Sequence, residues 1–444
     1  MTSWRDTSGD GVALALSVGG AAVVGLVSWV LAARVLDPGE LGTAAAFVSA
    51  VLLVAGCTDL NLGIAVMRWL PRAGGASRTV VLRAAGAVAV MAGVVGFVYV
   101  QLPAASLVVD AAAGPGGDRA LAVGLFTLTV VLYALLQHQD YVLVGVRRAW
   151  WAPARIGLLG VIRVSLLVGL GAGLTTVGVV WSWLVPTTVA VLVGSLVIAR
   201  ALVARTRVDD ALYRLPTRRE AVAFLGPTYV GKVATAVLYN QVPLLVTFRF
   251  GVEPGAAFFV VWQAVTVVDV VALYFVAPLT AAVARHPELA DELSRAVRRR
   301  LLLLLVPALV VAAGFSWSIL GLFGPSYRAA APVLVLMLAG SACRLLVIHR
   351  VGEHQARGRA LRYARLAVVN TLLVLGVALV APAGTPELPG LLLPIAAGFA
   401  LVQAGCGVVV VLRRRAERPG ADLPPGPAPR DGTREQHDRA DSDG

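Results

Sequence analysis

The apolar positions of the chain come in blocks of about twenty residues, separated by short polar segments that are rich in arginine. A helix of that length crosses a hydrocarbon core about 30 Å thick, whereas membrane-spanning strands give short segments that alternate between apolar and polar residues. The blocks lack that alternation. The pattern therefore predicts an all-α polytopic membrane protein with twelve transmembrane helices. Their approximate ranges are 11–33, 42–67, 84–103, 120–139, 156–173, 175–199, 221–247, 256–284, 301–323, 331–349, 366–382 and 389–412.

The segments between these helices are alternately rich and poor in arginine. The rich segments contain Arg5, then Arg68, Arg72, Arg78 and Arg83, then Arg147, Arg148 and Arg155, then six arginines between 200 and 219, five between 285 and 300, five between 350 and 365, and Arg413 to Arg415. The poor segments contain only Arg34, Arg119, Arg249 and Arg328. Because segments rich in Lys and Arg stay in the cytoplasm, we expect both termini on the cytoplasmic side.

A short turn recurs at the same point of the two halves. Residues 34–39 (RVLDPG) follow the first predicted span, and residues 249–255 (RFGVEPG) follow the seventh. Pro and Gly favour a tight turn, and the acid before them can cap the next helix. Two such turns predict two six-helix lobes related by a pseudo-two-fold axis along the membrane normal. This layout is typical of alternating access, although a duplicated scaffold without transport function has the same signature.

The predicted organisation has five parts. They are a cytoplasmic N-terminus at 1–10, an N-lobe at 11–200, a cytoplasmic linker at 201–220, a C-lobe at 221–412, and a disordered cytoplasmic tail at 413–444. The tail contains the run Pro424-Pro425-Gly426-Pro427 and has no apolar periodicity, as is typical of disorder.

The composition narrows the range of partners. The chain is 58% hydrophobic and 14% charged, with a formal net charge of +13. The basic residues lie mainly between spans, so the charge does not indicate nucleic-acid binding. Cys57, Cys343 and Cys406 fall in apolar runs, and the five histidines form no ligand spacing. We therefore expect no metal site and no cofactor.

Residues 31–72 (LAARVLDPGELGTAAAFVSAVLLVAGCTDLNLGIAVMRWLPR) carry a resemblance to a known family. They resemble the N-terminal signature of O-antigen and teichoic-acid exporters, the polysaccharide-transport branch of the multidrug/oligosaccharidyl-lipid/polysaccharide (MOP) exporter superfamily. The matching positions are Arg34, Pro38, Gly39, Gly42, Asp59, Arg68 and Pro71. Segments 250–263, 322–337 and 364–379 are similar to later parts of the same pattern. The chain departs from it at Tyr239-Asn240-Gln241, where the family often has an acid, and in having twelve helices where many members have fourteen.

The resemblance implies a flippase that moves a lipid-linked oligosaccharide, joined to polyprenol by pyrophosphate, to the outer leaflet of a bacterial cytoplasmic membrane. It also implies that a polysaccharide polymerase or glycosyltransferases are possible partners of the protein. One alternative is a multidrug or small-molecule, cation-coupled exporter of the same superfamily. A membrane-embedded enzyme would need an acid-rich catalytic loop or a large outer loop, and the sequence shows neither. A structural partner in an envelope complex would not need the buried charges described next.

Three cations fall well inside predicted spans: Lys232, Arg163 and Arg344. A charge inside hydrocarbon costs several kcal/mol unless it faces a cavity or a partner. Lys232 is expected close to the bilayer midplane, about 16 Å into its helix. We therefore expect the three to line a central cavity and bind the pyrophosphate of the substrate. The alternative is that they form structural ion pairs with Asp59 and Asp269.

Asp59 and Asp269 lie in the second and eighth predicted helices and are candidates for binding a coupling ion. Asn61 and Gly63 suggest that the helix unwinds after Asp59, so a helix cap is an equally good interpretation. The polar residues expected to line a sugar path, or alternatively to join helices by hydrogen bonds, are Asn61, Asn240, Gln241, Gln263 and Asn370. His138 and Asp140 are interpreted as an interfacial polar cluster, and Trp183 as an interfacial anchor.

Overall fold

The computed structural model describes residues 4–70, 73, 76–102, 105–114, 116–205, 218–285 and 287–416. Every regular element within these residues is a helix. The α-helices are α1 (Trp4–Val35), α2 (Pro38–Thr58), α3 (Leu62–Trp69), α4 (Ser77–Val100), α5 (Ser106–Ala113), α6 (Arg119–Gly145), α7 (Trp151–Leu170), α8 (Thr176–Arg205), α9 (Arg218–Phe250), α10 (Val252–Arg285), α11 (Ala290–Gly314), α12 (Ser316–Gly321), α13 (Ala331–Ala356), α14 (Ala360–Val380) and α15 (Leu393–Ala416).

Eleven of the described helices are long and apolar enough to cross a membrane. The remaining predicted span, 301–323, corresponds to α11 followed by the short α12. Arginines at the start of α11, among them Arg298 and Arg300, leave a continuous apolar stretch of only 301–314 within that helix. Large apolar side chains such as Val90, Leu192 and Leu401 are more than 60% exposed, which suits a lipid environment rather than water. The prediction of a multi-pass membrane protein with twelve spanning helices is confirmed.

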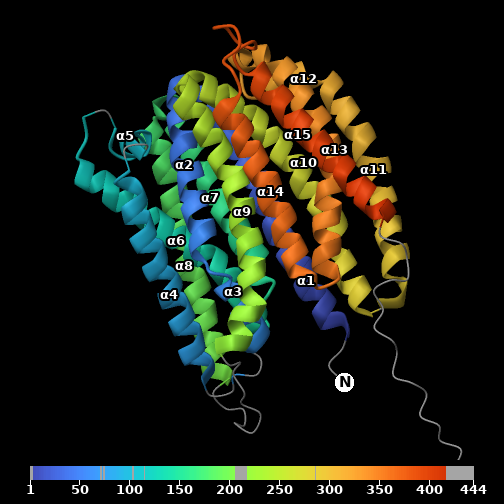
Figure 1. Cartoon of the computed structure of the whole chain (residues 1–444). Coiled ribbons are helices and arrows are strands. Elements are labelled where there is room, and N and C mark those ends of the chain that lie inside the picture. The colour runs from blue at the N-terminus through green and yellow to red at the C-terminus, as the bar shows by residue number, and fades with distance from the viewer. Residues whose placement is uncertain are drawn as a thin grey trace, which may run out of the picture.

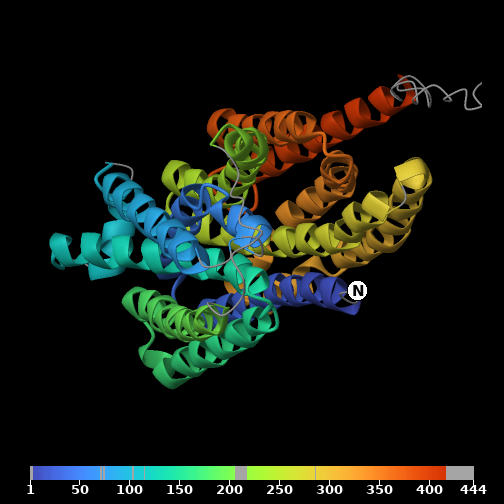
Figure 2. The same cartoon turned by 90° about the horizontal axis from the view of Figure 1, so that it is seen from below.

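The spanning helices form two lobes with the same internal packing. In the first half α1 packs on α7, α4 on α6, and α6 on α8; in the second, α9 packs on α14, α11 on α13, and α13 on α15. In Figure 1 the helices α2 to α8 of the first half lie on the left, α10, α11, α13 and α15 lie on the right, and α9 and α14 lie between them, while the start of α1 lies to the right of α14. The view from below separates the same two groups (Figure 2).

Several predicted boundaries differ from the helix ends. The predicted linker at 201–220 is shorter because α8 continues to Arg205 and α9 begins at Arg218; residues 206–217 lie outside the described residues. The helix α1 begins within the predicted N-terminal segment, at Trp4, and α15 continues to Ala416. The rest of the predicted disordered tail, including residues 424–427, lies outside the described residues.

The second predicted span, 42–67, is two helices rather than one. Leu60 and Asn61 have φ angles of 50° and 55°, in the left-handed region, and they separate α2 from α3. Asparagine adopts this conformation more readily than most residues because its short amide can bond locally. The helix therefore breaks at the point where Asn61 and Gly63 suggested unwinding.

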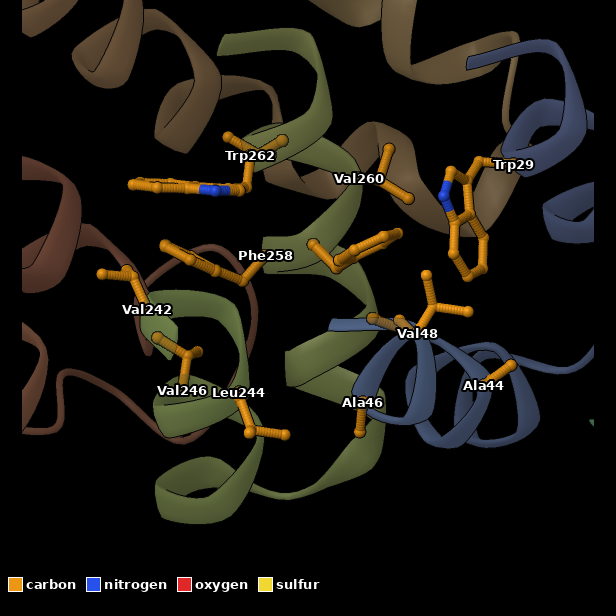
Figure 3. Packing of buried hydrophobic residues seen from close by; sticks show 14 of the residues in the cluster. Trp29, Ala44, Ala46, Val48, Val242, Leu244, Val246, Phe258, Val260 and Trp262 are labelled. Carbon is orange, nitrogen blue, oxygen red and sulfur yellow. The ribbon is translucent and has the colours of Figure 1, made fainter. Parts of the chain in front are cut away.

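The lobes are held together at one end of the bundle by a dry apolar core. We call this the turn end, because the Pro–Gly turns at 38–39 and 254–255 lie there, and the opposite end, where α1 begins, the basic end. Figure 3 shows Trp29, Phe258 and Trp262 in this core, packed against valines of α2 and α9. A Cβ placed on Gly42 would lie 2.1 Å from the carbonyl oxygen of Val252, so the start of α2 touches the start of α10. The turn end is therefore closed between the lobes.

Candidate functional site

A cavity of about 220 Å³ lies between the two lobes. Six helices contribute to its wall: α1, α2, α6 and α8 from the first lobe, and α9 and α10 from the second. Its aromatic lining consists of Trp29, Tyr133, Trp183, Tyr239, Phe259 and Trp262, and its polar lining of Ser49, Asn240, Gln263 and Thr266. The cavity is thus an aromatic box with amide and hydroxyl groups, and none of its described lining residues is charged.

The predicted polar residues divide between this cavity and other places. Asn240 and Gln263 line the cavity, whereas Gln241, next to Asn240, does not. The Asn61 amide donates to the Thr228 hydroxyl at 3.1 Å, and Asn370 belongs to a buried network inside the C-lobe. The three predicted cations are not among the lining residues either. In this conformation, therefore, Lys232, Arg163 and Arg344 do not line the cavity as the sequence predicted.

Arg344 on α13 is neutralised by Asp269 on α10. Its Nε donates to the Asp269 carboxylate at 2.7 Å, its Nη1 to the Asn370 side chain at 2.8 Å, and its Nη2 to the Tyr239 hydroxyl at 3.2 Å. The Tyr239 hydroxyl in turn donates to Asp269 at 2.7 Å, and Asn370 donates to Gln403 at 3.1 Å. This network joins five helices of the C-lobe, and Tyr239 is its one member among the described residues that line the cavity.

Lys232 on α9 is paired with Asp59 across the two lobes. The Lys232 ammonium donates to one Asp59 oxygen, and the other oxygen lies 3.5 Å from Nδ1 of His138. The Tyr229 hydroxyl donates to the Cys57 carbonyl at 2.5 Å beside them. The 21 residues of α2 that precede Asp59 correspond to about 32 Å of helix. The pair therefore lies near the basic end rather than at the midplane, where the sequence placed Lys232.

Arg163 on α7 is the exception among the buried charges. It is 3% exposed, its Nε donates to the Ser182 carbonyl at 3.2 Å, and its guanidinium carbon lies 3.8 Å from the ring centroid of Trp183. Every other buried Asp, Glu or Arg of the described residues has a partner of opposite charge: Asp59 with Lys232, Arg155 with Asp140, Arg344 with Asp269, and Arg350 with Glu353.

Sequence reasoning missed Arg155, which it assigned to a cytoplasmic segment. The side chain is 1% exposed and donates to Asp140 and to Gln139, each at 2.5 Å. Gln139 donates in turn to the Val191 carbonyl at 3.2 Å, so the network joins α6, α7 and α8. Arg155 lies only four residues after α7 begins, and for that reason it resembled a loop arginine in the sequence.

Two further interpretations from the sequence need correction. His138 does not form a cluster with Asp140 at an interface; it is fully buried beside Asp59. Trp183 is not an interfacial anchor, because it is 6% exposed and forms part of the cavity wall, with its ring centroid 6.3 Å from that of Trp29. A tryptophan close to the end of an apolar run gives the same sequence signal in either position, so the sequence could not separate them.

No protein-family model matches the sequence, and no curated protein sequence matches it. Similarity appears in the fold. An inward-facing multidrug resistance MATE family transporter of the MOP superfamily superposes with a TM-score of 0.66 and 16% identity, over 89% of this chain and 94% of that chain. An outward-facing structure of such a transporter gives 0.61 and 15% identity, over 91% and 93%. The chain has the fold of the MATE transporters.

A third solved structure superposes on the chain over a similar length. It is a MOP superfamily transporter from Pyrococcus furiosus whose binding pocket is described as having reverse polarity, suggesting a different function. It superposes with a TM-score of 0.62 and 15% identity, over 91% of this chain and 93% of that chain. The fold is compatible with the resemblance seen in residues 31–72, because the structures that it matches include transporters described as members of the MOP superfamily. The polysaccharide branch is a finer distinction, which the fold does not make.

Proposed function

We propose that the protein is an alternating-access exporter that moves a lipid-linked oligosaccharide from the cytoplasmic to the outer leaflet of a bacterial cytoplasmic membrane. The observation that carries the proposal is the aromatic and amide lining of the cavity between the lobes. Asn240 and Gln263 offer both donors and acceptors, as sugar hydroxyls require, and the aromatic rings offer flat apolar surface. The enzymes that would supply and use such a cargo are glycosyltransferases and a polysaccharide polymerase.

The two seams between the lobes support an amphipathic cargo. On one side α2 packs closely along α9, and the Asp59–Lys232 pair and the Asn61–Thr228 hydrogen bond fasten it. On the other side α1 touches α10 much more sparsely. The cavity lies along this second seam, where it is lined by residues of both helices, such as Gly25 and Val270. A lipid tail could leave the cavity between α1 and α10 while the glycan stays inside.

A multidrug exporter is the second candidate, and the fold favours it. An inward-facing and an outward-facing multidrug resistance transporter both match the chain. Aromatic rings also bind organic cations through their faces. However, no acid is among the described lining residues, and Arg163, which alone among the buried charges of the described residues has no partner of opposite charge, is positive. A positive field opposes a cationic drug, so the glycan cargo fits the charges better.

We also propose Asp59, rather than Asp269, as the group that binds a coupling ion. Asp59 lies at a helix break, and although its own side chain is buried, its partner Lys232 is 25% exposed, so water reaches one member of the pair. Asp269 is bound by both Arg344 and Tyr239 in a site where the Arg344 side chain is only 7% exposed. Removing Lys232 from Asp59 would accompany opening of the α2–α9 seam, which links ion binding to movement of the lobes.

The test is a leaflet-accessibility assay in proteoliposomes with a fluorescent polyprenyl-pyrophosphate-linked glycan, run beside an ethidium efflux assay. We expect glycan movement and no ethidium efflux. The Asn240→Ala/Gln263→Ala double variant should move the glycan roughly 30-fold more slowly, because it loses two hydrogen bonds worth about 1 kcal/mol each. Gln241→Ala is the matched control, since Gln241 neighbours Asn240 outside the cavity. Ethidium efflux without glycan movement would establish the multidrug exporter instead.

A further inference from the structure

The surroundings of Arg163 leave part of its guanidinium without a partner. The Nη2 atom is buried and has no hydrogen-bond acceptor among the described residues. The contacts that the side chain does make are one backbone carbonyl, that of Ser182, and the face of the Trp183 ring. A buried cation is normally matched by an acid or by several acceptors. Within the described residues, the Arg163 site therefore lacks an anion to balance the charge of the guanidinium.

Trp183 separates this cation from the cavity. One face of the indole carries the Arg163 guanidinium, and the indole is also part of the cavity wall. Tyr133, the neighbouring wall residue, lies 6.1 Å from Trp183 between ring centroids. Trp183 is therefore the side chain that would have to move for a ligand in the cavity to reach the guanidinium.

The other two cations that the sequence predicted for the cavity, Lys232 and Arg344, are not available in the same way. Arg344 already shares Asp269 with Tyr239, and Lys232 already holds Asp59. An anion that approached either of them would have to displace a carboxylate. Arg163 can accept an anion without losing any ionic contact.

We propose that Arg163 is the anion-binding residue of this transporter, that its ligand is the phosphate or pyrophosphate group of a polyprenyl-linked cargo, and that Trp183 is the gate in front of it. The proposal rests on the proposed function for the cargo, but the anion site itself is independent of the glycan. A guanidinium binds phosphate oxygens through parallel hydrogen bonds, and the low dielectric of the site strengthens them. The pairing supplies the missing anion and neutralises the buried charge.

The experiment measures binding of farnesyl diphosphate, with farnesol as the uncharged control, to the full chain in nanodiscs. We expect the wild type to bind the diphosphate more tightly than farnesol. Arg163→Gln should weaken diphosphate binding at least tenfold and leave farnesol binding unchanged, and Arg163→Lys should lie between them. The double variant Arg155→Gln/Asp140→Asn is the matched control, because it removes a buried arginine on the same helix together with its acid; its diphosphate binding should stay within twofold of the wild type.

A purely structural role for Arg163 predicts a different set of results. It predicts that Arg163→Gln lowers the melting temperature without ligand and leaves the preference for diphosphate over farnesol intact, and that result would overturn the proposal. So would a wild type that binds both compounds equally. If Arg163→Gln does not fold, the comparison of Arg163→Lys with wild type decides. Diphosphate binding that depends on Arg163, together with no movement of the lipid-linked glycan, would keep the anion site and reject only the proposed cargo.

Discussion

Arg155 and Arg163 lie two turns apart on α7, and both are almost completely buried. The guanidinium of Arg155 is enclosed by Asp140, Gln139 and the carbonyls of Ala190 and Leu136. The guanidinium of Arg163 has one carbonyl and one aromatic face. Among the described residues, Nε of Arg155 and Nη2 of Arg163 both lack an acceptor. The difference is therefore one of charge: the site of Arg155 contains an acid, Asp140, and the site of Arg163 contains none.

The difference separates two reasons for a charge inside a membrane. A charge that is paired and hydrogen-bonded stabilises the arrangement of the helices around it, because removing either partner leaves the other uncompensated. A charge that is left unpaired gives no such benefit and adds a desolvation cost, so an interaction with a ligand is the better explanation. Stability and transport measurements should accordingly respond in opposite ways at the two positions.

The largest expected effect on stability is that of Arg155→Met. This variant leaves Asp140 without its cation and should lower the free energy of unfolding by about 3–5 kcal/mol. Arg163→Met, in contrast, removes an unpaired buried charge and should leave the melting temperature unchanged or raise it. Thermal unfolding in detergent, followed by size-exclusion chromatography, measures both. The double variant Arg155→Met/Asp140→Asn should recover most of the loss; equal melting temperatures for the two single variants would remove the distinction between the sites.

The sequence predicted the helices well because local hydropathy determines where spans lie. It also suggested the helix break after Asp59 and the pairing of buried cations with Asp59 and Asp269 as one of two interpretations. The cavity itself could not be predicted. Its wall combines Trp29, Trp183 and Trp262, which are far apart in the chain and meet only because the lobes dock. The burial of Arg155 could not be predicted for a related reason: its acid, Asp140, is fifteen residues away on another helix.

The Asp59–Lys232 pair should show a smaller loss, because Lys232 is partly exposed and water screens the interaction. Lys232→Ala should lower the free energy of unfolding by about 1–3 kcal/mol, since it leaves Asp59 buried with only His138 beside it. The double variant Asp59→Asn/Lys232→Gln should lose less than the sum of its two single variants, which a double-mutant cycle measures. Additive losses would mean that the pair does not fasten the α2–α9 seam.

Gly194 on α8 packs against the Arg155 guanidinium, so a substitution there tests how tightly the Arg155 site is packed. A Cβ at this position would lie 2.2 Å from Nη1 of Arg155 and 2.3 Å from the Gln139 side-chain oxygen, so the guanidinium occupies the space that a side chain would need. Gly194→Ala should cost about 1–2 kcal/mol by overpacking. Gly157→Ala on α7 is the control: nothing lies within 4 Å of its Cβ position, and the change should be neutral or stabilising. The melting temperature should therefore fall for Gly194→Ala and should stay the same or rise for Gly157→Ala.

The smallest effect is expected at Trp183, where substitutions should change the association rate of the ligand. Trp183→Phe keeps an aromatic face over Arg163 but makes the gate smaller, so the association rate of farnesyl diphosphate should rise a few-fold with little change in melting temperature. Trp183→Ala removes both the gate and the cation–π contact, worth about 1–2 kcal/mol when desolvated. Its association rate should rise further, while its stability falls. Stopped-flow mixing with farnesyl diphosphate measures the rates. If both variants bind at the wild-type rate, Trp183 is only packing on Arg163, and the anion reaches the guanidinium from another side of α7.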